Sequence, residues 1–262
     1  MSKALHALME GLIDYAGLFP PASLEMADAA RNYESYLDGE YSWALGRFVI
    51  PAAKLSEADN SWKVSVIGVP PRWVESCEIK IDHAPQAAGV LSGAPQGVTT
   101  YFEVPLNEDP RPLAGMGVRA KIRLGGLTPE AFPSCADLAH FLHSAAAANV
   151  AFKATAGLHH PIRSLHRLTN DPDSPSVMMH GFVNLFLAAA LLWHRGSTEA
   201  DALATLEETS PDAFRFEENC VSWHGRSMTA SQISSARRKF AISYGCCAFE
   251  EPIQGLKDLG WL

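Results

Sequence analysis

The stretch VAFKATAGLHHPI, from Val150 to Ile162, decides how the fold is interpreted. Lys153 stands in an otherwise apolar run, which then leads into Gly157 and two adjacent histidines. Alternate side chains of a β-strand point to opposite faces of the sheet. Lys153 and Thr155 therefore share one face of the expected strand, and the apolar residues Val150, Phe152 and Ala154 share the other. This pattern predicts a strand with one polar face.

The same alternation occurs in three expected strands that precede this stretch. Their polar residues share one parity: Glu78, Lys80 and Asp82 in EIKIDH, Tyr101 and Glu103 in TTYFEVP, and Arg119, Lys121 and Arg123 in RAKIRLG. An antiparallel sheet with one face in water would give this pattern too. Long helical patterns separate the later strands, and no Asn-Gly or Asp-Gly hairpin turn joins them. These features favour a closed parallel barrel with its polar residues turned inward.

The order of elements along the chain agrees with such a barrel. Eight β-rich runs are expected to be strands, at 12–19, 47–51, 62–69, 78–83, 99–106, 119–126, 150–157 and 214–223. Helical patterns cover 23–37, 134–149, 177–196, 197–210 and 229–245. No linker-like tract interrupts them. We therefore predict an α/β fold, a TIM-barrel-like (β/α)8 single domain over residues 1–262, with residues 248–262 as a carboxyl-terminal covering segment.

Net charge and cysteine content indicate which binding partners and which cellular compartment to expect. The formal net charge of −8 argues against nucleic acid or an anionic membrane as a partner, because both attract basic surfaces. A small molecule, which can itself be anionic, is the expected partner, and a homo-oligomer remains open. Five scattered cysteines fit a reducing cytoplasm. The amino-terminal apolar segment is interrupted by Glu10 and Asp14, so we expect neither a signal peptide nor a membrane span.

Two lysines on neighbouring strands carry the catalytic hypothesis. Lys121 and Lys153 would lie side by side in the barrel, where burial and a second cation lower the pKa of an amine. A neutral lysine can attack a carbonyl carbon, and the carboxylates of Asp82 and Glu103 could move the protons. We assign these four residues as catalytic. The alternative is a structural network of ion pairs that performs no chemistry.

The segment KATAG, Lys153 to Gly157, resembles the Lys-x-x-x-Gly segments of class I, Schiff-base aldolases, in particular the deoxyribose-phosphate aldolase family. The resemblance implies a (β/α)8 barrel, a nucleophilic lysine, a second lysine that lowers its pKa, and an aspartate that shuttles protons. Lys121, Lys153 and Asp82 would fill these roles. KIRLGG lacks the family's Thr or Ser after the lysine, and the two histidines are foreign to it. The family's strand order makes Lys121 the nucleophile, whereas the local motif favours Lys153.

The chain as a whole also resembles members of an uncharacterised bacterial protein family. The resemblance rests on LIDYAGLFPPA and on the segment FEEP near the end of the chain. It implies no activity.

Residues expected at the mouth of the barrel would bind the substrate. His159 and His160 follow the seventh expected strand, where active sites of such barrels lie, and their alternation predicts that only one of them faces the pocket. Gly125 and Gly126 could let backbone amides approach an anion beside Arg123, although a turn that requires glycine explains them equally well. The expected binding set is Arg123, Thr155, His159, His160, Gly125 and Gly126.

The sequence therefore predicts a lyase of the aldolase type that acts on a small carbonyl or carboxylate compound without a cofactor. One alternative is a metal-dependent lyase or hydrolase, in which the histidines join carboxylates around a divalent metal. Its candidate ligands are Asp82, Glu103, His159, His160, His180 and His224. Another alternative is a barrel that binds a small anion without catalysis.

Overall fold

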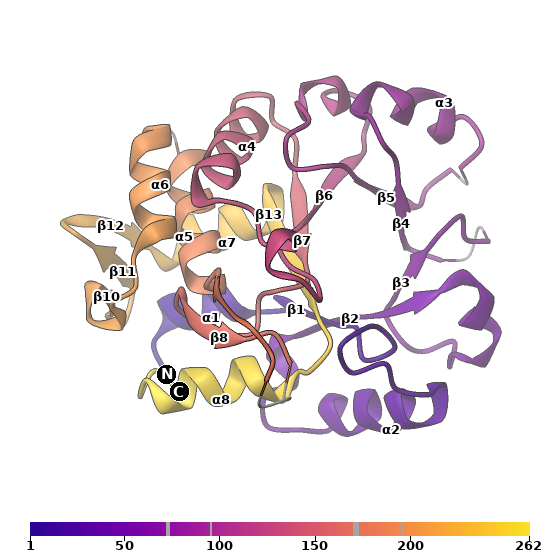
Figure 1. Cartoon of the computed structure of the whole chain (residues 1–262), viewed down its shortest axis with the longest axis horizontal. Coiled ribbons are helices and arrows are strands. Elements are labelled where there is room, and N and C mark those ends of the chain that lie inside the picture. The colour runs from indigo at the N-terminus through magenta and orange to yellow at the C-terminus, as the bar shows by residue number, and fades with distance from the viewer. Residues whose placement is uncertain (72–73, 95, 170–172, 195) are drawn as a thin grey trace.

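The computed structural model of the chain describes residues 1–71, 74–94, 96–169, 173–194 and 196–262. Its centre is a closed barrel of parallel strands in the order β1-β13-β7-β6-β5-β4-β3-β2 (Figure 1). The barrel strands are β1 (Ile13–Tyr15), β2 (Leu45–Pro51), β3 (Val64–Ile67), β4 (Ser76–Lys80), β5 (Thr99–Glu103), β6 (Arg119–Arg123), β7 (Phe152–Thr155) and β13 (Ala241–Cys246). With its flanking helices this is the TIM-barrel architecture, so the predicted fold class is confirmed.

The helices are α1 (Lys3–Met9), α2 (Met26–Leu37), α3 (Ala87–Leu91), α4 (Cys135–Ala147), α5 (Phe182–Trp193), α6 (Glu199–Glu207), α7 (Ala230–Lys239) and α8 (Glu250–Asp258). Several begin at side chains that cap the free backbone N–H groups of the first turn. Ser134 accepts a hydrogen bond from the backbone N–H of Asp137 at the start of α4, and Thr198 and Thr229 form capping boxes at α6 and α7. Within the described residues, none of these helices has the length and apolarity needed to cross a bilayer.

The eighth barrel strand was predicted at 214–223, and this prediction is wrong. That segment forms β10 (Phe214–Phe216) and β11 (Cys220–Trp223) of a separate antiparallel sheet, which β12 (Arg226–Thr229) completes. His224 and Gly225 join β11 to β12 with φ of 44° and 79°, as in tight two-residue hairpins. Because this turn is His-Gly, a search for Asn-Gly or Asp-Gly does not find it.

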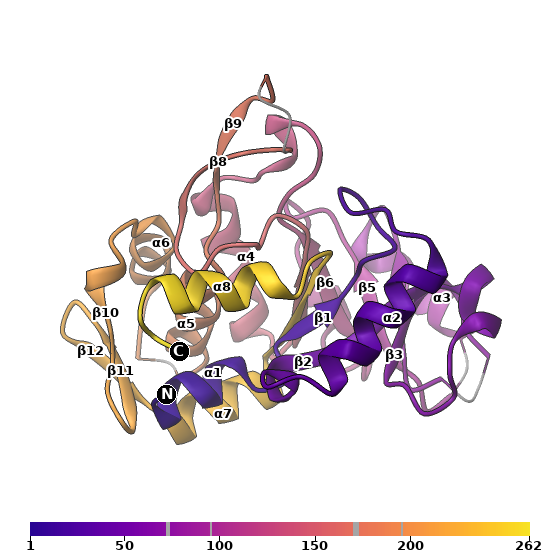
Figure 2. The same cartoon turned by 90° about the horizontal axis from the view of Figure 1, so that it is seen from below.

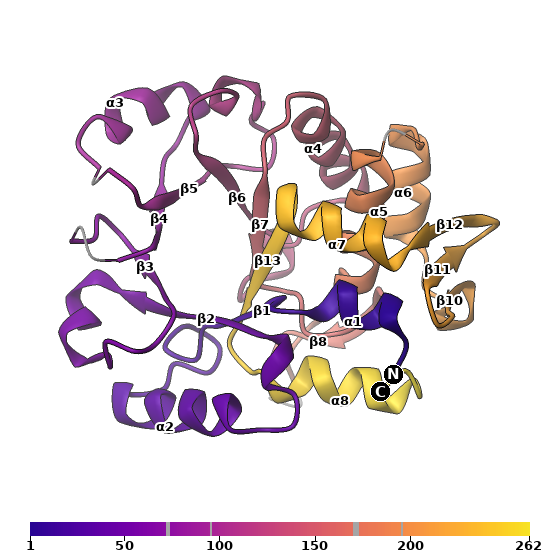
Figure 3. The ribbon, with the colours of Figure 1, turned by 180° about the vertical axis from the view of Figure 1, so that it is seen from behind.

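The true eighth strand is β13, which lies inside a segment predicted to be helical. Helix α7 ends at Lys239 and β13 begins at Ala241, where it pairs with β1 on one side and β7 on the other (Figure 3). Residues 177–179 of another predicted helix likewise belong to a strand. They lie in β9 (Ser176–Met179), which pairs with β8 (Ser164–Arg167) in a hairpin that stands out from the barrel (Figure 2).

Helices cover the barrel unevenly. Next to β6, β7 and β13 they form two layers, because α5 packs against α4, α6 and α7 and is buried along almost its whole length (Figure 1). Phe182 of α5 stacks on Tyr244 of β13, and Phe186 packs against the same ring at a tilt of 42°. Between β3 and β6, the described residues of the connections form α3 and short 3-10 turns and no longer helix. The apolar parity of the later strands thus packs outward on helices, as the sequence predicts.

Candidate active site

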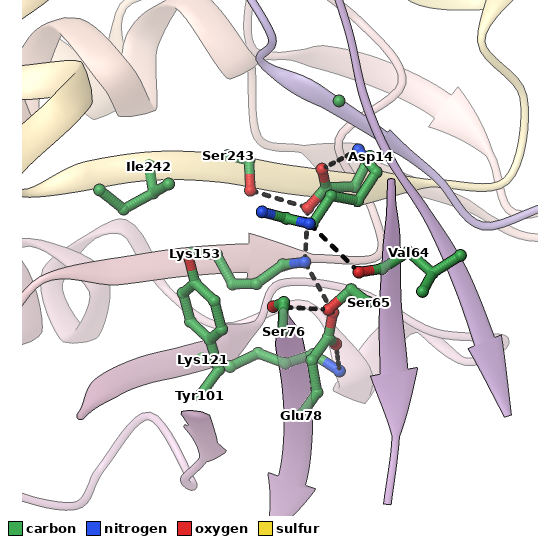
Figure 4. A network of polar contacts seen from close by, with 12 residues as sticks. Asp14, Val64, Ser65, Ser76, Glu78, Tyr101, Lys121, Lys153, Ile242 and Ser243 are labelled. Atoms are coloured by element: carbon green, nitrogen blue, oxygen red, sulfur yellow. Dashed lines mark hydrogen bonds and ion pairs between the residues drawn. The ribbon is translucent and has the colours of Figure 1, made fainter. Parts of the chain in front are cut away.

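The interior of the barrel holds a continuous network of opposite charges (Figure 4). Lys153 Nζ on β7 lies 2.5 Å from Asp14 Oδ2 on β1 and 2.7 Å from Glu78 Oε1 on β4. These strands are not neighbours in the barrel, so the three side chains meet across its interior. The side chain of Lys153 is 1 % exposed, and those of Asp14 and Glu78 are 4 % and 2 % exposed. The centre of the barrel is therefore closed to solvent.

The network continues from Glu78 toward the mouth. Lys121 Nζ on β6 lies 2.7 Å from Glu78 Oε2 and 2.7 Å from Glu103 Oε2 on β5. Glu103 Oε1 in turn accepts a 3.4 Å hydrogen bond from Arg123 Nε. We call the chain of alternating charges Asp14, Lys153, Glu78, Lys121, Glu103 and Arg123 the charge network. Lys121 and Lys153 are direct partners in the register of β6 and β7, so the two lysines are neighbours as the parity of the sequence predicts.

Neutral groups complete the hydrogen bonding of the buried carboxylates. Ser243 on β13 donates to Asp14 Oδ2 over 2.8 Å, and the backbone N–H of Arg47 donates to Asp14 Oδ1 over 2.7 Å. Ser65 on β3 donates to Glu78 Oε1 over 2.8 Å. These contacts offset much of the cost of taking the carboxylates out of water.

The carboxylates set the protonation states of the network. Desolvation alone would raise the pKa of Glu78, but the positive charges of Lys153 and Lys121 outweigh it and hold that pKa below its ordinary value. Desolvation alone would lower the pKa of Lys153, but Asp14 and Glu78 outweigh it and raise that pKa. The expected depression of the lysine pKa is therefore wrong for Lys153, because the sequence did not show that two carboxylates surround it.

The other predicted catalytic and binding residues on these strands lie in different positions. Glu103 belongs to the network, and its pKa is lowered because Lys121 and Arg123 outweigh desolvation. Asp82 lies beyond the end of β4 and is exposed, so it does not join the lysines. Thr155 is half-buried at the end of β7, between Arg123 and Gly245 in the strand register. Arg123 is the exposed end of the network, at 54 % exposure.

Gly125 and Gly126 have a packing role in the loop that follows β6. A Cβ atom at Gly125 would lie 2.7 Å from the Cα atom of Gly157, in the loop that follows β7. A Cβ atom at Gly126 would lie 2.7 Å from the side chain of Ala131. These loops therefore touch backbone to backbone at Gly125 and Gly157, and a larger residue at Gly125 would separate them. The predicted anion-binding role of the two glycines stays a prediction.

The side chains of His159 and His160 contact different elements of the fold. His159 Nδ1 lies 2.5 Å from Glu251 Oε2 in the first turn of α8 and 3.7 Å from Cys246 Sγ at the end of β13. The His160 ring instead stacks on His166 of β8, with ring centroids 3.3 Å apart. Among the described residues, neither ring forms a hydrogen bond to the charge network. Both histidines contact neighbouring elements of the fold, and the expectation that only one of them faces a substrate pocket stays a prediction.

The histidines of the metal hypothesis do not converge. His180 Nε2 lies 2.9 Å from the backbone carbonyl of Pro133, and His224 Nε2 lies 2.7 Å from Glu208 Oε2, next to the β11–β12 turn. Across the described ranges, no group of three or more His, Cys, Asp or Glu side chains has the arrangement of a metal site. The chemistry that the geometry supports is therefore that of the lysines and carboxylates.

Two cavities of the structure lie away from the charge network. One of about 510 Å³ lies between residues 211–215 and the end of α8, beside Trp261. The other, of about 740 Å³, lies between the segment that follows α3 and residues 116–118. None of the network residues lines either cavity.

Sequence reasoning missed two of the six network residues as functional candidates. Glu78 has the same parity as Lys80 and Asp82, but the aldolase resemblance pointed to Asp82 as the aspartate. Asp14 lies within the strand expected at 12–19 and is the central residue of β1, but no role in the site was expected for it. The usable signal was a single acid within a short apolar run, as in LIDYAGL.

Comparison with protein family models and with curated proteins found no match to this chain.

Proposed function

We propose that the protein is an enzyme that acts on a small carbonyl or carboxylate compound at the carboxyl-terminal mouth of the barrel, with Lys121 as its reactive amine. One observation carries the proposal. Exposure rises along the charge network, from 1 % for the side chain of Lys153 to 5 % for Lys121, 15 % for Glu103 and 54 % for Arg123. A small molecule that enters from the mouth meets Arg123 and Glu103 first, and Lys121 is the first lysine that it can reach.

The geometry assigns a role to each of these residues. Arg123 can bind a carboxylate of the substrate, because a guanidinium presents paired N–H donors to such a group. Glu103 can take a proton from Lys121 when the substrate displaces their ion pair, and the neutral amine then attacks the carbonyl carbon. Glu103 returns the proton to the departing hydroxyl, which leaves as water, and an imine remains on Lys121.

Lys153 is then a supporting cation. Asp14 and Glu78 hold it in place, and it shares the Glu78 carboxylate with Lys121. This choice of nucleophile agrees with the strand order of the Schiff-base aldolases that KATAG resembles, in which the earlier lysine reacts. It replaces the choice of Lys153 that the local motif favours.

Borohydride trapping tests this assignment. The protein is incubated with pyruvate, glyoxylate and glyceraldehyde, reduced with borohydride, and digested for peptide mass mapping. We expect an adduct on Lys121 that is absent in Lys121→Arg, a variant that keeps the cation between Glu78 and Glu103 but cannot form an imine. In Arg123→Met, trapping of the two keto acids should fall about tenfold more than trapping of glyceraldehyde, which has no carboxylate.

A matched control separates specific from general labelling. Lys80 ends β4 and is exposed, so Lys80→Met removes a freely accessible amine near the mouth. The adduct on Lys121 should be unchanged in this variant. An adduct on Lys80 or Lys153 without one on Lys121 would overturn the assignment. If no compound labels any lysine of the network but pyruvate still binds in calorimetry, the barrel is a non-catalytic binder of small anions.

A further inference from the structure

A second group of reactive side chains lies outside the charge network, where β13, the loop after β7 and the first turn of α8 meet. Cys246 ends β13 and Cys247 follows it. His159 Nδ1 lies 3.7 Å from Cys246 Sγ and 2.5 Å from Glu251 Oε2. We call these four residues the thiol–imidazole cluster. Cys246 is 2 % exposed, Cys247 is 9 % exposed and the His159 side chain is 16 % exposed, so the cluster opens to solvent at one side.

The imidazole of this cluster is held in its charged form. The charge of a Cys246 thiolate is the largest influence that raises the pKa of His159, and hydrogen bonds to both thiols and to Glu251 add to it against the effect of burial. The hydrogen bond from His159 also lowers the pKa of Glu251. His159 is thus placed to exchange a proton with the Cys246 sulfur, 3.7 Å away, and the thiolate is the nucleophilic form of a cysteine.

The other cysteines have surroundings that oppose the thiolate. Cys220 Sγ lies 3.2 Å from Glu217 Oε2, and this carboxylate raises the pKa of the Cys220 thiol. Burial raises the pKa of the Cys77 and Cys135 thiols. Cys135 also has a cation nearby, Arg163, but burial outweighs its effect. Cys246 and Cys247 are therefore distinguished from the other three by being adjacent to each other and by the contact of Cys246 with His159.

We propose that Cys246 and Cys247 form a redox-active dithiol that a hydroperoxide oxidises to a disulfide between adjacent residues, with His159 as the proton donor. This inference does not rest on the proposed aldolase-type activity, because it uses no residue of the charge network. The fold brings His159 and Cys246 together although they are 87 residues apart in the sequence, and Cys247 is adjacent to Cys246.

The reaction proceeds in two balanced steps. The Cys246 thiolate attacks one oxygen of the hydroperoxide, the O–O bond breaks, and the departing oxygen takes the proton of His159, which gives a sulfenic acid and water or an alcohol. The Cys247 sulfur then attacks the sulfenic sulfur and the S–O bond breaks. The hydroxyl leaves as water with the proton of the Cys247 thiol, so the two thiols are oxidised and the peroxide is reduced.

The disulfide between Cys246 and Cys247 should be easy to reduce. Neighbouring Cα atoms are about 3.8 Å apart across a trans peptide, whereas disulfides usually join Cα atoms about 4.4–6.8 Å apart. A disulfide between adjacent cysteines is therefore strained, and strained disulfides have more oxidising potentials. We infer a reversible site, which a monothiol or dithiol reductant restores.

Titration with hydrogen peroxide tests the site in the full-length protein, with peptide mass mapping as the readout. We expect the peptide that contains Cys246 and Cys247 to lose two hydrogen atoms, and dithiothreitol to restore them. In Cys247→Ser the reaction should stop at the sulfenic acid, which dimedone traps on Cys246. In His159→Gln the rate of oxidation should fall about tenfold, because the cationic proton donor is gone.

Cys220 is the internal control, because it is more accessible than either cysteine of the cluster. Cys220→Ser should leave the rate of disulfide formation unchanged. The proposal is overturned if Cys220 is oxidised first and the adjacent pair stays reduced. It is also overturned if Cys246 is oxidised at the same rate in His159→Gln, provided that circular dichroism shows that the variant is folded.

Discussion

The charge network and the thiol–imidazole cluster both contain ionisable side chains in contact, but they differ in the number of partners and in their exposure to solvent. In the network each inner charge has two partners of opposite sign: Lys153 lies between Asp14 and Glu78, and Lys121 lies between Glu78 and Glu103. These side chains are 15 % exposed or less. In the cluster, His159 shares one nitrogen between Glu251 and Cys246, and Glu251 is 57 % exposed. The inner part of the network, from Asp14 to Glu103, is closed to solvent, whereas the cluster is open at Glu251.

The difference shows that burial does not by itself make a group reactive. A buried lysine between two carboxylates is fixed as an ammonium, and its charge serves the packing of the barrel. A partly exposed imidazole beside a thiol and a carboxylate can exchange its proton with solvent. Reactivity is therefore expected where the partners are incomplete, at the outer end of the network and in the cluster.

The largest effect is expected from Glu78→Gln. This change leaves Lys153 and Lys121 facing a neutral amide in the closed part of the barrel, and breaking a buried ion pair costs about 3–5 kcal/mol. We expect the free energy of unfolding, measured by urea denaturation, to fall by this amount. Thr100→Val, a similarly buried change at a hydroxyl of β5 outside the network, is the control and should cost far less. A loss for Glu78→Gln below about 1 kcal/mol would mean that water reaches the network.

A smaller effect, which depends on pH, is expected at His160. Burial and then the positive charges of His166 and His159 lower the pKa of His160 to about 4. His160 becomes protonated below about pH 6.5 in the unfolded chain, but only below about pH 4 in the folded protein. Between these values the unfolded state binds more protons, so His160 destabilises the fold progressively as pH falls. His160→Phe keeps the ring stack on His166 and removes the titration.

The wild-type protein should therefore lose about 2 kcal/mol more than His160→Phe between pH 7 and pH 5, measured by denaturation at each pH. His194→Phe is the control, since His194 is an exposed histidine away from the barrel mouth. Equal losses in the wild type and His160→Phe would show that the stacked ring is protonated in the folded protein.

The smallest effect is expected from Glu251→Gln in the open cluster. The pKa of His159 is raised, so the pair contributes fully below the ordinary histidine pKa of about 6.5 and loses its contribution as pH rises through the folded pKa. Because Glu251 is mostly exposed, the variant should lose less than about 1 kcal/mol at pH 6, and less again in high salt. A loss at pH 6 as large as that of Glu78→Gln would remove the distinction between the closed and the open site.

The alternation of polar and apolar residues predicted the barrel and the inward lysines, because parity is a local property of a strand. It could not identify the partners of Lys153. Asp14 and Glu78 are 139 and 75 residues away in sequence, and only closure of the barrel brings them to Lys153. Strand β13 was missed because a single residue, Phe240, separates it from the end of α7, so that 229–245 was interpreted as one helix. The single-domain organisation stays a prediction.

The strict alternation of charge in the barrel interior also limits how this sequence can change over generations. Three carboxylates and three cations are linked in one chain, so the loss or reversal of any inner charge leaves its neighbours unmatched in a place that water does not reach. Substitution of Lys153 by a neutral residue is compatible with the fold only if Asp14 or Glu78 also becomes neutral. These positions should accordingly vary together among descendants of this chain, while Arg123, at the exposed end, is free to vary alone.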